Sequence, residues 1–453
     1  MLFQTVNPTT ETIIKTYPNH KWNEVYKKIK IAQNAFLKWR ETSYAERKKC
    51  MINMARYLKK ESSKLGKIIT EEMGKPIQEA IGEVNKCALN FEYYAENGEK
   101  FMADQFIKTE SKKSYIKFEP LGIILEIMPW NFPFWQVMRI SASMIMAGNV
   151  ALLKHAPSVP KSALTIEKAF AKNFPKGIFQ NLFVQVSEIK KIIENENIKG
   201  VTFTGSDTAG SKVASLCAKE IKKVILELGG SDPFMVFEDA DLEKATKMCS
   251  ISRFLNCGQV CIAAKRILVQ EKILDKFLEK FKNKIANIKI GDPKDKKTQL
   301  GPLHSKEALE TIEKQVRKSI KMGAKIVLGG KKINRKGYFF EPTILQNINP
   351  EMSVYKEEIF GPVAVVMQFK DLEEAVKIAN DTPYGLGASV WTKNTKIIKK
   401  IIPKLEVGRV FVNDMVKTDP RLPVGGVKRS GLGRELSHYG MHEFSNIKTV
   451  NIN

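Results

Sequence analysis

The sequence contains little of what secreted, membrane-spanning or metal-dependent chains need. Its six cysteines are sparse among 453 residues and form no CxxC pair, which argues against a disulfide framework. No apolar run approaches the ~18 residues needed to cross a membrane. The beginning, MLFQTVNPTTETIIK, has no basic segment followed by an apolar one. The five histidines are dispersed, and His438 and His442, which would share a helical face, have no thiolate beside them. We expect a cytoplasmic protein with no metal site and no membrane contact.

Acidic residues are outnumbered by basic ones. Lys+Arg 74 against Asp+Glu 49 gives a net charge of +25, and such a surface can attract nucleic-acid phosphates. The lysines, however, are mixed with glutamates in helical segments such as EKAFAKNFPK and LDKFLEKFKNK. They do not interleave with aromatic residues as a base-stacking surface would. We therefore expect a metabolic role without a nucleic-acid partner. The alternative is a nucleic-acid-binding protein, whose binding to a duplex would depend steeply on salt concentration.

The chain begins with helical patterns and continues with alternating strands and helices. Apolar residues at three- and four-residue spacing predict helices throughout the first hundred residues, as in WNEVYKKIKIAQNAFLKWR. From about residue 115, short apolar runs such as GIILEIMP, NVALLKHAP and GVTFTG predict strands, with helical stretches between them. This alternation predicts a parallel sheet, which binds ligands beyond the carboxyl ends of its strands.

A second α/β unit is predicted after ILELGGSDPF, running through the strand RILVQ to VFVND. The chain ends in EFSNIKTVNIN, a strand-like segment rich in β-branched residues with no helix to pair with. A terminal strand of this kind often completes a sheet elsewhere, another subunit included.

Three residues carry candidate chemistry. Cys261 lies in NCGQVCIAAKR, and as a nucleophile it would need help from its site, because a free thiol is mostly protonated at neutral pH. A buried structural cysteine is the commoner alternative. Glu227 ends the apolar run VILE, which suits a general base, but a capping or salt-bridged glutamate is equally compatible. Asn131 follows a strand and suits an oxyanion donor or a cap for the helix that Pro133 begins.

A glycine-containing turn, GSDTAG, follows the strand VTF and opens a helix at residues 205–210. Such a turn lets phosphate approach backbone N–H groups at the positive end of a helix. It is neither a Walker A loop nor GxGxxG, and an ordinary tight turn is the alternative.

Taken in order, these pieces resemble the aldehyde dehydrogenase superfamily over nearly the whole chain. The resemblance rests on VNPTTETII, EEMGKP, MPWNFP, LLKHAP, FTGS, LELGGSDPF, GQVC, EEIFGPV and PYGLGASVW. MPWNFPFWQVMR, LLKHAPSV and DPRLPVGGVKRSGLGRELSHYG look most like the succinate-semialdehyde dehydrogenase branch. The resemblance implies an α/β fold with a Rossmann-like dinucleotide-binding domain (1–107 and 123–227) and an α/β catalytic domain (228–420). The resemblance also implies a β-strand oligomerisation arm, which together with the C-terminal strand comprises residues 108–122 and 421–453.

The resemblance also implies roles for individual residues. Cys261 matches the nucleophile that forms a thiohemiacetal and then a thioester, Asn131 with the Cys261 N–H matches the oxyanion hole, and Glu227 matches the base that activates water. On the cofactor side it implies contacts from Trp130, Lys154, Gly205, Ser206, Glu358 and Phe360.

One departure bears on cofactor choice. NAD-preferring relatives often carry a glutamate three residues after the lysine that matches Lys154, whereas this chain has Pro157 followed by Ser158. Without that carboxylate a 2′-phosphate would meet no like-charge repulsion, and Lys154 could pair with it. We expect NADP to be accepted, with NAD as the alternative.

A carboxylate-bearing aldehyde would need a cation in the substrate tunnel. Arg139 is the candidate, because it lies four residues after Trp135 on the same predicted helical face. Thr418 and Arg421 belong to the loop that resembles the substrate-side loop of this branch, while Lys265 and Arg266 suit structural ion pairs equally well.

The predicted function is therefore NAD(P)-dependent oxidation of succinate semialdehyde to succinate by a homodimer or homotetramer. The alternatives are the same chemistry on another semialdehyde, glyceraldehyde or lactaldehyde, and a non-catalytic protein that keeps the fold. Cys257, four residues before Cys261, could pair with it under oxidation or be a small packed side chain.

Overall fold

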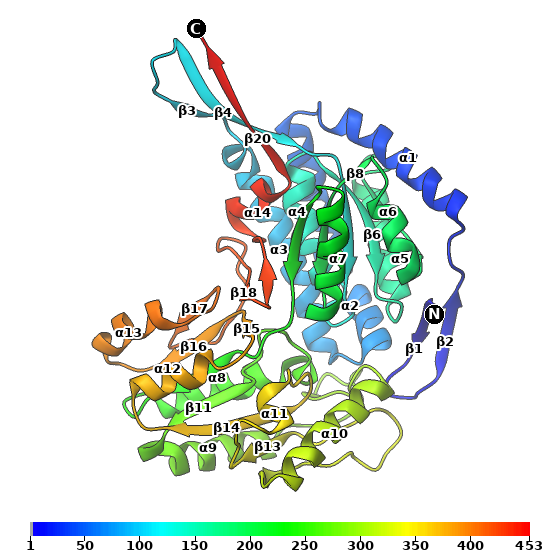
Figure 1. The fold of residues 1–453 in the computed structure, drawn as a ribbon. Helices are drawn as coiled ribbons and strands as arrows, with labels where there is room; N and C mark the ends of the chain where they lie inside the picture. Colours follow the sequence, from blue (N-terminus) through cyan, green and yellow to red (C-terminus); the bar gives the residue numbers. More distant parts are fainter. Residues whose placement is uncertain (1–2) are drawn as a thin grey trace.

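The first α/β unit is built around a six-stranded sheet in a computed structural model that describes residues 3–453 (Figure 1). The strand order is β19 (Gly431–Leu432), β9 (Lys223–Glu227), β8 (Ile198–Thr204), β5 (Ile123–Met128), β6 (Val150–His155) and β7 (Phe179–Asn181). All neighbours are parallel except β19, which runs antiparallel to β9. Every residue of β5 and β6 is buried, as expected for a parallel sheet covered on both faces by helices.

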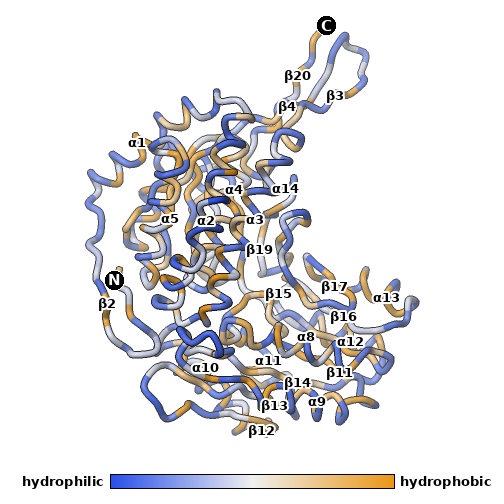
Figure 2. The backbone as a smooth tube through the Cα atoms, turned by 180° about the vertical axis from the view of Figure 1, so that it is seen from behind, coloured by the Kyte–Doolittle hydropathy of each residue, from blue (hydrophilic) through white to orange (hydrophobic). Residues whose placement is uncertain are grey.

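Helices of this unit are α1 (Trp22–Trp39), α2 (Tyr44–Met73), α3 (Ile77–Phe101), α4 (Trp135–Met146), α5 (Pro160–Asn173), α6 (Ile189–Ile193), α7 (Asp207–Lys219) and α14 (Ser437–Glu443). Ser43 begins α2 with a capping box, and Gly74 ends it in a left-handed conformation. Figure 2 shows apolar and polar residues alternating along these helices. Most of these helices bury one side against the sheet or a neighbouring helix, whereas every residue of α4 is buried.

The second unit contains a seven-stranded sheet. Its order is β12 (Lys325–Leu328), β13 (Thr343–Gln346), β14 (Val363–Phe369), β11 (Arg266–Gln270), β10 (Pro233–Val236), β16 (Ala388–Trp391) and β17 (Val410–Val412). Only β12 is antiparallel to its neighbour. The helices are α8 (Leu242–Phe254), α9 (Leu274–Ala286), α10 (Lys306–Lys321), α11 (Ser353–Lys356), α12 (Leu372–Asn380) and α13 (Thr395–Ile401). The buried apolar residues form two clusters, one for each unit.

A three-stranded antiparallel arm projects from the first unit (Figure 1). It consists of β20 (Ser445–Ile452), β4 (Lys113–Pro120) and β3 (Gln105–Ile107), with Ser445 opposite Pro120 and Ile452 opposite Lys113. The C-terminal strand therefore finds its partner within its own chain, on a strand more than three hundred residues earlier.

The beginning of the chain differs from the prediction of helices throughout. An antiparallel pair, β1 (Phe3–Val6) and β2 (Ile13–Tyr17), precedes α1. The two strands are short, and four of the five residues of β2 are exposed, so no apolar alternation marks them in the sequence. The remaining elements are the pair β15 (Tyr384–Gly385) with β18 (Val427–Lys428), and 3₁₀ turns at η1 (Val186–Glu188), η2 (Leu255–Gly258), η3 (Glu271–Ile273) and η4 (Ile402–Lys404).

Candidate active site

A constrained turn carries Cys261 out of α8. Asn256, Cys257 and Gly258 have φ values of 51°, 56° and 71°, and the left-handed conformation costs about 1–2 kcal/mol for each residue with a side chain. Two side chains hold the turn: Oε2 of the half-buried Glu79 accepts from the Asn256 N–H at 2.8 Å, and Nη2 of the buried Arg253 donates to the Gly258 carbonyl at 2.9 Å. The strain is compensated by these contacts, and they fix the position of the residues that follow.

Two cavities meet at Cys261. The first has a volume of about 230 Å³ and lies beyond the ends of β5, β8 and β9. It is lined by Pro129, Trp130, Asn131, Gln136, Thr204, Gly205, Ser206, Leu228, Gly229, Cys261, Glu358 and Phe360. The second, of about 160 Å³, shares Cys261 and Gln136 with the first and contains Glu227, Arg139, Trp135 and Thr418. The thiol therefore lies between two spaces of different composition.

Burial disfavours ionisation of the Cys261 thiol. Desolvation raises its pKa; the charge of Lys265 opposes this effect, and that of Glu227 adds to it. Lys265 Nζ donates to the Cys261 carbonyl at 2.6 Å and forms an ion pair with Glu358 at 2.9 Å. A thiol with a raised pKa needs a nearby base to remove its proton before the sulfur can attack.

Glu227, the last residue of β9, is placed to be that base. Burial raises its pKa from 4.5 to about 7, although the positive charge of Arg139 opposes the shift. Arg139 Nη2 lies 3.9 Å from Glu227 Oε2, while Oε1 has no hydrogen-bond partner among residues 3–453. A carboxylate with a pKa near neutrality and an unused oxygen suits proton transfer at physiological pH.

Asn131 is fixed at the other side of the thiol. Its backbone carbonyl accepts from Lys75 Nζ at 2.9 Å and from Asn256 Nδ2 at 2.8 Å. Its side-chain amide donates one N–H to the Gln259 carbonyl at 3.1 Å. Because an amide has two N–H donors, the second is available to a developing oxyanion in the first cavity.

The first cavity brings together most of the residues expected to hold a cofactor. Ser206 caps α7 by accepting from the Ala209 N–H, and the Gly205 N–H donates to the Glu227 carbonyl at 3.1 Å. Trp130 stacks on His304 with ring centroids 3.4 Å apart and meets Phe360 edge-on at 5.8 Å. The start of α7 therefore opens onto a space with aromatic walls, an arrangement that suits a pyrophosphate and a ring.

Lys154 and the turn after β6 lie outside the lining of that cavity. Lys154 is buried and forms no ion pair within residues 3–453, and desolvation lowers its pKa to about 8. Pro157 and Ser158 lie on a half-buried turn three and four residues further on. A buried ammonium without a protein carboxylate fits an anionic partner such as a phosphate group.

The structure brings together three of the four residues predicted for the substrate side. Trp135 and Thr418 line the second cavity, as does Arg139, but Arg139 is not a free cation. Its Nε forms an ion pair with Glu435, and Glu227 lies on its other side. Arg421 does not line the cavity: its side chain is 75% exposed and makes a two-bond contact with Asp419.

Four lining or charged residues had not been predicted from the sequence. Gln136 borders both cavities, Glu435 neutralises Arg139, and Lys86 and Arg409 line the second cavity. Gln136 could have been found, since it follows Trp135 on the same segment. Lys86 and Arg409 lie outside the quoted motifs, and no spacing signals them. Glu435 lies within DPRLPVGGVKRSGLGRELSHYG, but nothing in that segment signals its pairing with Arg139.

Other polar residues singled out in the sequence have structural surroundings. Arg266 donates to three backbone carbonyls, of Ser231, Ile378 and Ala379. Cys257 is 1% exposed and packs in the second apolar cluster. Residues 3–453 contain no group of three or more His, Cys, Asp or Glu side chains placed to hold a metal ion. No helix in that range is long and apolar enough to span a membrane.

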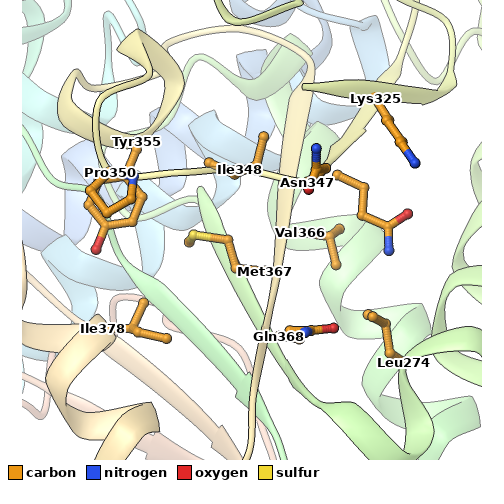
Figure 3. A pocket seen from close by; sticks show the side chains of 11 residues that line it. Leu274, Lys325, Asn347, Ile348, Pro350, Tyr355, Val366, Met367, Gln368 and Ile378 are labelled. Atoms are coloured by element: carbon orange, nitrogen blue, oxygen red, sulfur yellow. The ribbon is translucent and has the colours of Figure 1, made fainter. Parts of the chain in front are cut away.

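A separate pocket of about 380 Å³ lies on the second sheet. It is bordered by β13, β14 and residues of α9, α11 and α12 (Figure 3). Its lining includes Lys325, Asn347, Tyr355, Met367 and Gln368 and shares no residue with the two cavities at Cys261. It has neither a thiol nor a carboxylate in its walls, so it offers no nucleophile or carboxylate base.

Comparison with known proteins agrees with this geometry. The model of the aldehyde dehydrogenase family matches residues 1–450. A probable NADP-dependent succinate-semialdehyde dehydrogenase of Synechocystis sp. is 44% identical over 451 residues, 99% of each chain. Succinate-semialdehyde dehydrogenase 1 of Mycobacterium bovis, named as NADP-dependent, is 43% identical over 454 residues, again 99% of each chain. The crystal structure of succinic semialdehyde dehydrogenase from Streptococcus pyogenes in complex with NADP⁺ superposes with a TM-score of 0.97, at 36% identity and 99% coverage of both chains. The chain therefore belongs to the aldehyde dehydrogenase family.

Proposed function

We propose that this protein oxidises succinate semialdehyde to succinate with NADP⁺ as the hydride acceptor. The observation that carries the proposal is the position of Cys261, between a carboxylate with a pKa of about 7 and an amide with a spare N–H donor. Nucleophile, base and oxyanion donor in one place are what covalent aldehyde oxidation requires. The names of the Synechocystis, mycobacterial and streptococcal relatives support the substrate and the cofactor.

In the first half of the reaction Glu227 accepts the proton of the Cys261 thiol, directly or through water. The thiolate sulfur attacks the aldehyde carbon, and the carbonyl oxygen becomes an oxyanion that the Asn131 amide and the Cys261 backbone N–H stabilise. A nicotinamide held in the first cavity would supply the hydride acceptor, and loss of hydride from this carbon would leave a thioester on Cys261.

In the second half Glu227 acts as a general base on water. Glu227 first releases the thiol proton to solvent and then takes a proton from water as the water oxygen attacks the thioester carbon. The carbon–sulfur bond breaks, the Cys261 sulfur leaves as a thiolate, and succinate is released. The raised pKa of Glu227 matches this task, because a carboxylate that stays strongly acidic would be a poor proton acceptor.

The residues on the nucleotide side suit NADP. Gly205, Ser206 and the start of α7 would hold the pyrophosphate, while Glu358 and Phe360 would hold the nicotinamide ribose. Lys154 lacks a carboxylate partner and is followed by Pro157 and not by an acid, so a 2′-phosphate would meet a cation there. This fit supports NADP over NAD.

We also propose that the protein works in the cytoplasm as a homodimer or homotetramer. The projecting arm exposes Phe106, Ile107, Ile447 and Ile452, an apolar surface that suits contact with another subunit. All six cysteines are free, in keeping with a reducing compartment. In this proposal residues 1–107 and 123–227 bind the dinucleotide, 228–420 hold the nucleophile, and 108–122 with 421–453 form the arm and the terminal strand.

Absorbance at 340 nm tests the proposal directly. Purified protein is given succinate semialdehyde or butanal, each with NADP⁺ or NAD⁺, and we expect the fastest rise with the semialdehyde and NADP⁺. Cys261→Ala should abolish turnover and retain nucleotide binding, whereas Cys50→Ala on α2 serves as the matched control and should behave as wild type. Equal rates on both aldehydes would remove the substrate from the proposal, and turnover by Cys261→Ala would remove the mechanism.

A further inference from the structure

The second cavity at Cys261 has more positive charge than the protein itself balances. Its lining includes four cations: Lys86, Arg139, Arg409 and Lys417. Arg139 is paired with Glu435 and Glu227, and Lys417 is paired with Asp414. No carboxylate within residues 3–453 lies within 4.0 Å of a side-chain nitrogen of Lys86 or Arg409.

Lys86, on α3, is directed toward the substrate-side loop. Its Nζ donates to the Thr418 hydroxyl and lies 4.3 Å from the centre of the Trp135 ring. Desolvation lowers the pKa of this ammonium to about 8, and the charges of Arg139 and Arg409 act in the same direction. An additional negative group in the cavity would favour the charged form.

Arg409 precedes β17 at the edge of the second sheet, and its guanidinium has unused donors. Its Nε and Nη1 are buried and have no hydrogen-bond partner in the described part of the chain. A guanidinium does not lose its proton in proteins, and buried N–H donors without acceptors are costly. Lys86 and Arg409 line the same cavity of about 160 Å³, so one anion bound there lies beside both cations.

We propose that Lys86 and Arg409, together with the Thr418 hydroxyl, form the receptor for the carboxylate of the substrate. This inference rests on the proposed oxidation at Cys261 and assigns its substrate class: short aldehydes that carry a carboxylate at the opposite end of the chain. Arg139 has a different part. Arg139 lies between Glu227 and Glu435 and positions the base. These two carboxylates balance its positive charge, so that charge is not available to a ligand.

The same cations explain how the cavity would choose among aldehydes. A small cavity of about 160 Å³ accepts only a short chain, and the aldehyde carbon must reach Cys261 while the far end reaches α3 and the segment before β17. An uncharged aldehyde would leave two half-buried cations without an anionic partner, whereas a carboxylate would satisfy both.

Charge-removing variants of the complete protein test the receptor. Lys86→Met and Arg409→Gln, singly and combined, are compared by kcat/KM for succinate semialdehyde and for butanal, the uncharged aldehyde of the same length. We expect each single variant to lose about 10- to 100-fold with the semialdehyde, which is the usual range for a hydrogen bond to a charged group. Rates with butanal should stay near wild type, which also shows that the variants fold.

Two controls separate a charge effect from a local disturbance. Lys417→Met removes a cation from the same cavity that already has a carboxylate partner, so it should leave the preference for the semialdehyde unchanged. Lys86→Arg and Arg409→Lys keep the charge and should restore much of the preference lost in the neutral variants.

The outcomes distinguish this inference from the proposed function. If wild type prefers the semialdehyde and both neutral variants keep that preference, the receptor is elsewhere and the proposed function stands. If wild type shows no preference for the semialdehyde over butanal, the proposed substrate and the receptor both fail. A loss that is equal for both aldehydes would show a structural role and would also overturn the receptor.

Discussion

Replacement of Glu227 by Gln should abolish turnover and at the same time stabilise the folded protein at alkaline pH. Gln has nearly the same shape as Glu but neither ionises nor accepts a proton from the thiol or from water, so both half-reactions lose their base. The stability effect follows from burial, which raises the pKa of Glu227 from 4.5 to about 7. At ~1.4 kcal/mol for each pH unit, the ionised form costs the folded state about 3 kcal/mol.

The sign of the effect depends on pH. At pH below 4.5 Glu227 is protonated in both the folded and the unfolded chain, and its contribution to stability is complete. Between 4.5 and 7 the folded protein binds more protons than the unfolded chain, so stability falls as pH rises. Above about 7 the full cost is present in wild type and absent from Glu227→Gln.

Urea unfolding of wild type and Glu227→Gln across this pH range measures the difference. The two proteins should be equally stable near pH 4.5, and the variant should be more stable by about 3 kcal/mol above pH 7. Glu220→Gln, at an exposed carboxylate after α7, is the control and should show no such divergence. In parallel, kcat of wild type should fall as pH drops below about 7. A stability difference that does not change with pH would refute the assignment of Glu227 as a base poised near neutrality.

Three further variants test other parts of the site. Asn131→Ala removes an oxyanion donor and should lower kcat about 10²–10³-fold, while KM for the aldehyde changes much less. An unaltered kcat in steady-state kinetics would contradict the role of Asn131 as an oxyanion donor. Lys154→Met should raise KM for NADP⁺ about tenfold or more and affect NAD⁺ less, because the 2′-phosphate loses its cation; equal changes for both nucleotides would count against it. Lys75→Met leaves Glu83 buried without its ammonium partner and should lower the free energy of unfolding by about 3–5 kcal/mol. The melting temperature should fall accordingly, and an unchanged melting temperature would show that the pair contributes little.

The local parts of the fold and site could be predicted from the sequence because each has a local signature. Short apolar runs separated by helical stretches predicted the parallel strands β5, β6, β8 and β11. The motif residues Cys261, Glu227 and Asn131 are flanked by strands or turns that the sequence also indicates. The helix around Trp135 was likewise predicted, and it is α4. The pair β1 and β2 was missed because both strands are short and β2 is largely exposed.

Charge pairing could not be predicted, since it depends on contacts between distant segments. Arg139 was expected to be available to a substrate, but Glu435, from the far end of the chain, lies against its Nε. Arg421 was expected in the same cavity, but Asp419, two residues earlier, holds it at the surface. Conversely, Lys86 and Arg409 look like ordinary surface cations in the sequence and line the cavity only because α3 and the segment before β17 converge there. A residue's type indicates which charge it can supply, and its partners decide whether that charge is free.

The same distinction identifies the base. Burial raises the pKa of Glu72, Glu79, Asp232 and Glu227 alike to about 7, so a perturbed pKa by itself does not select among them. Glu72 uses both oxygens to accept from Thr5, Lys161 and Ser162, which makes it a structural acceptor. Of the four, Glu227 is the one that shares a cavity with the Cys261 thiol. Geometry therefore favours Glu227 as the proposed base, and burial raises its pKa to about 7, which suits the activation of a thiol and a water molecule near neutral pH.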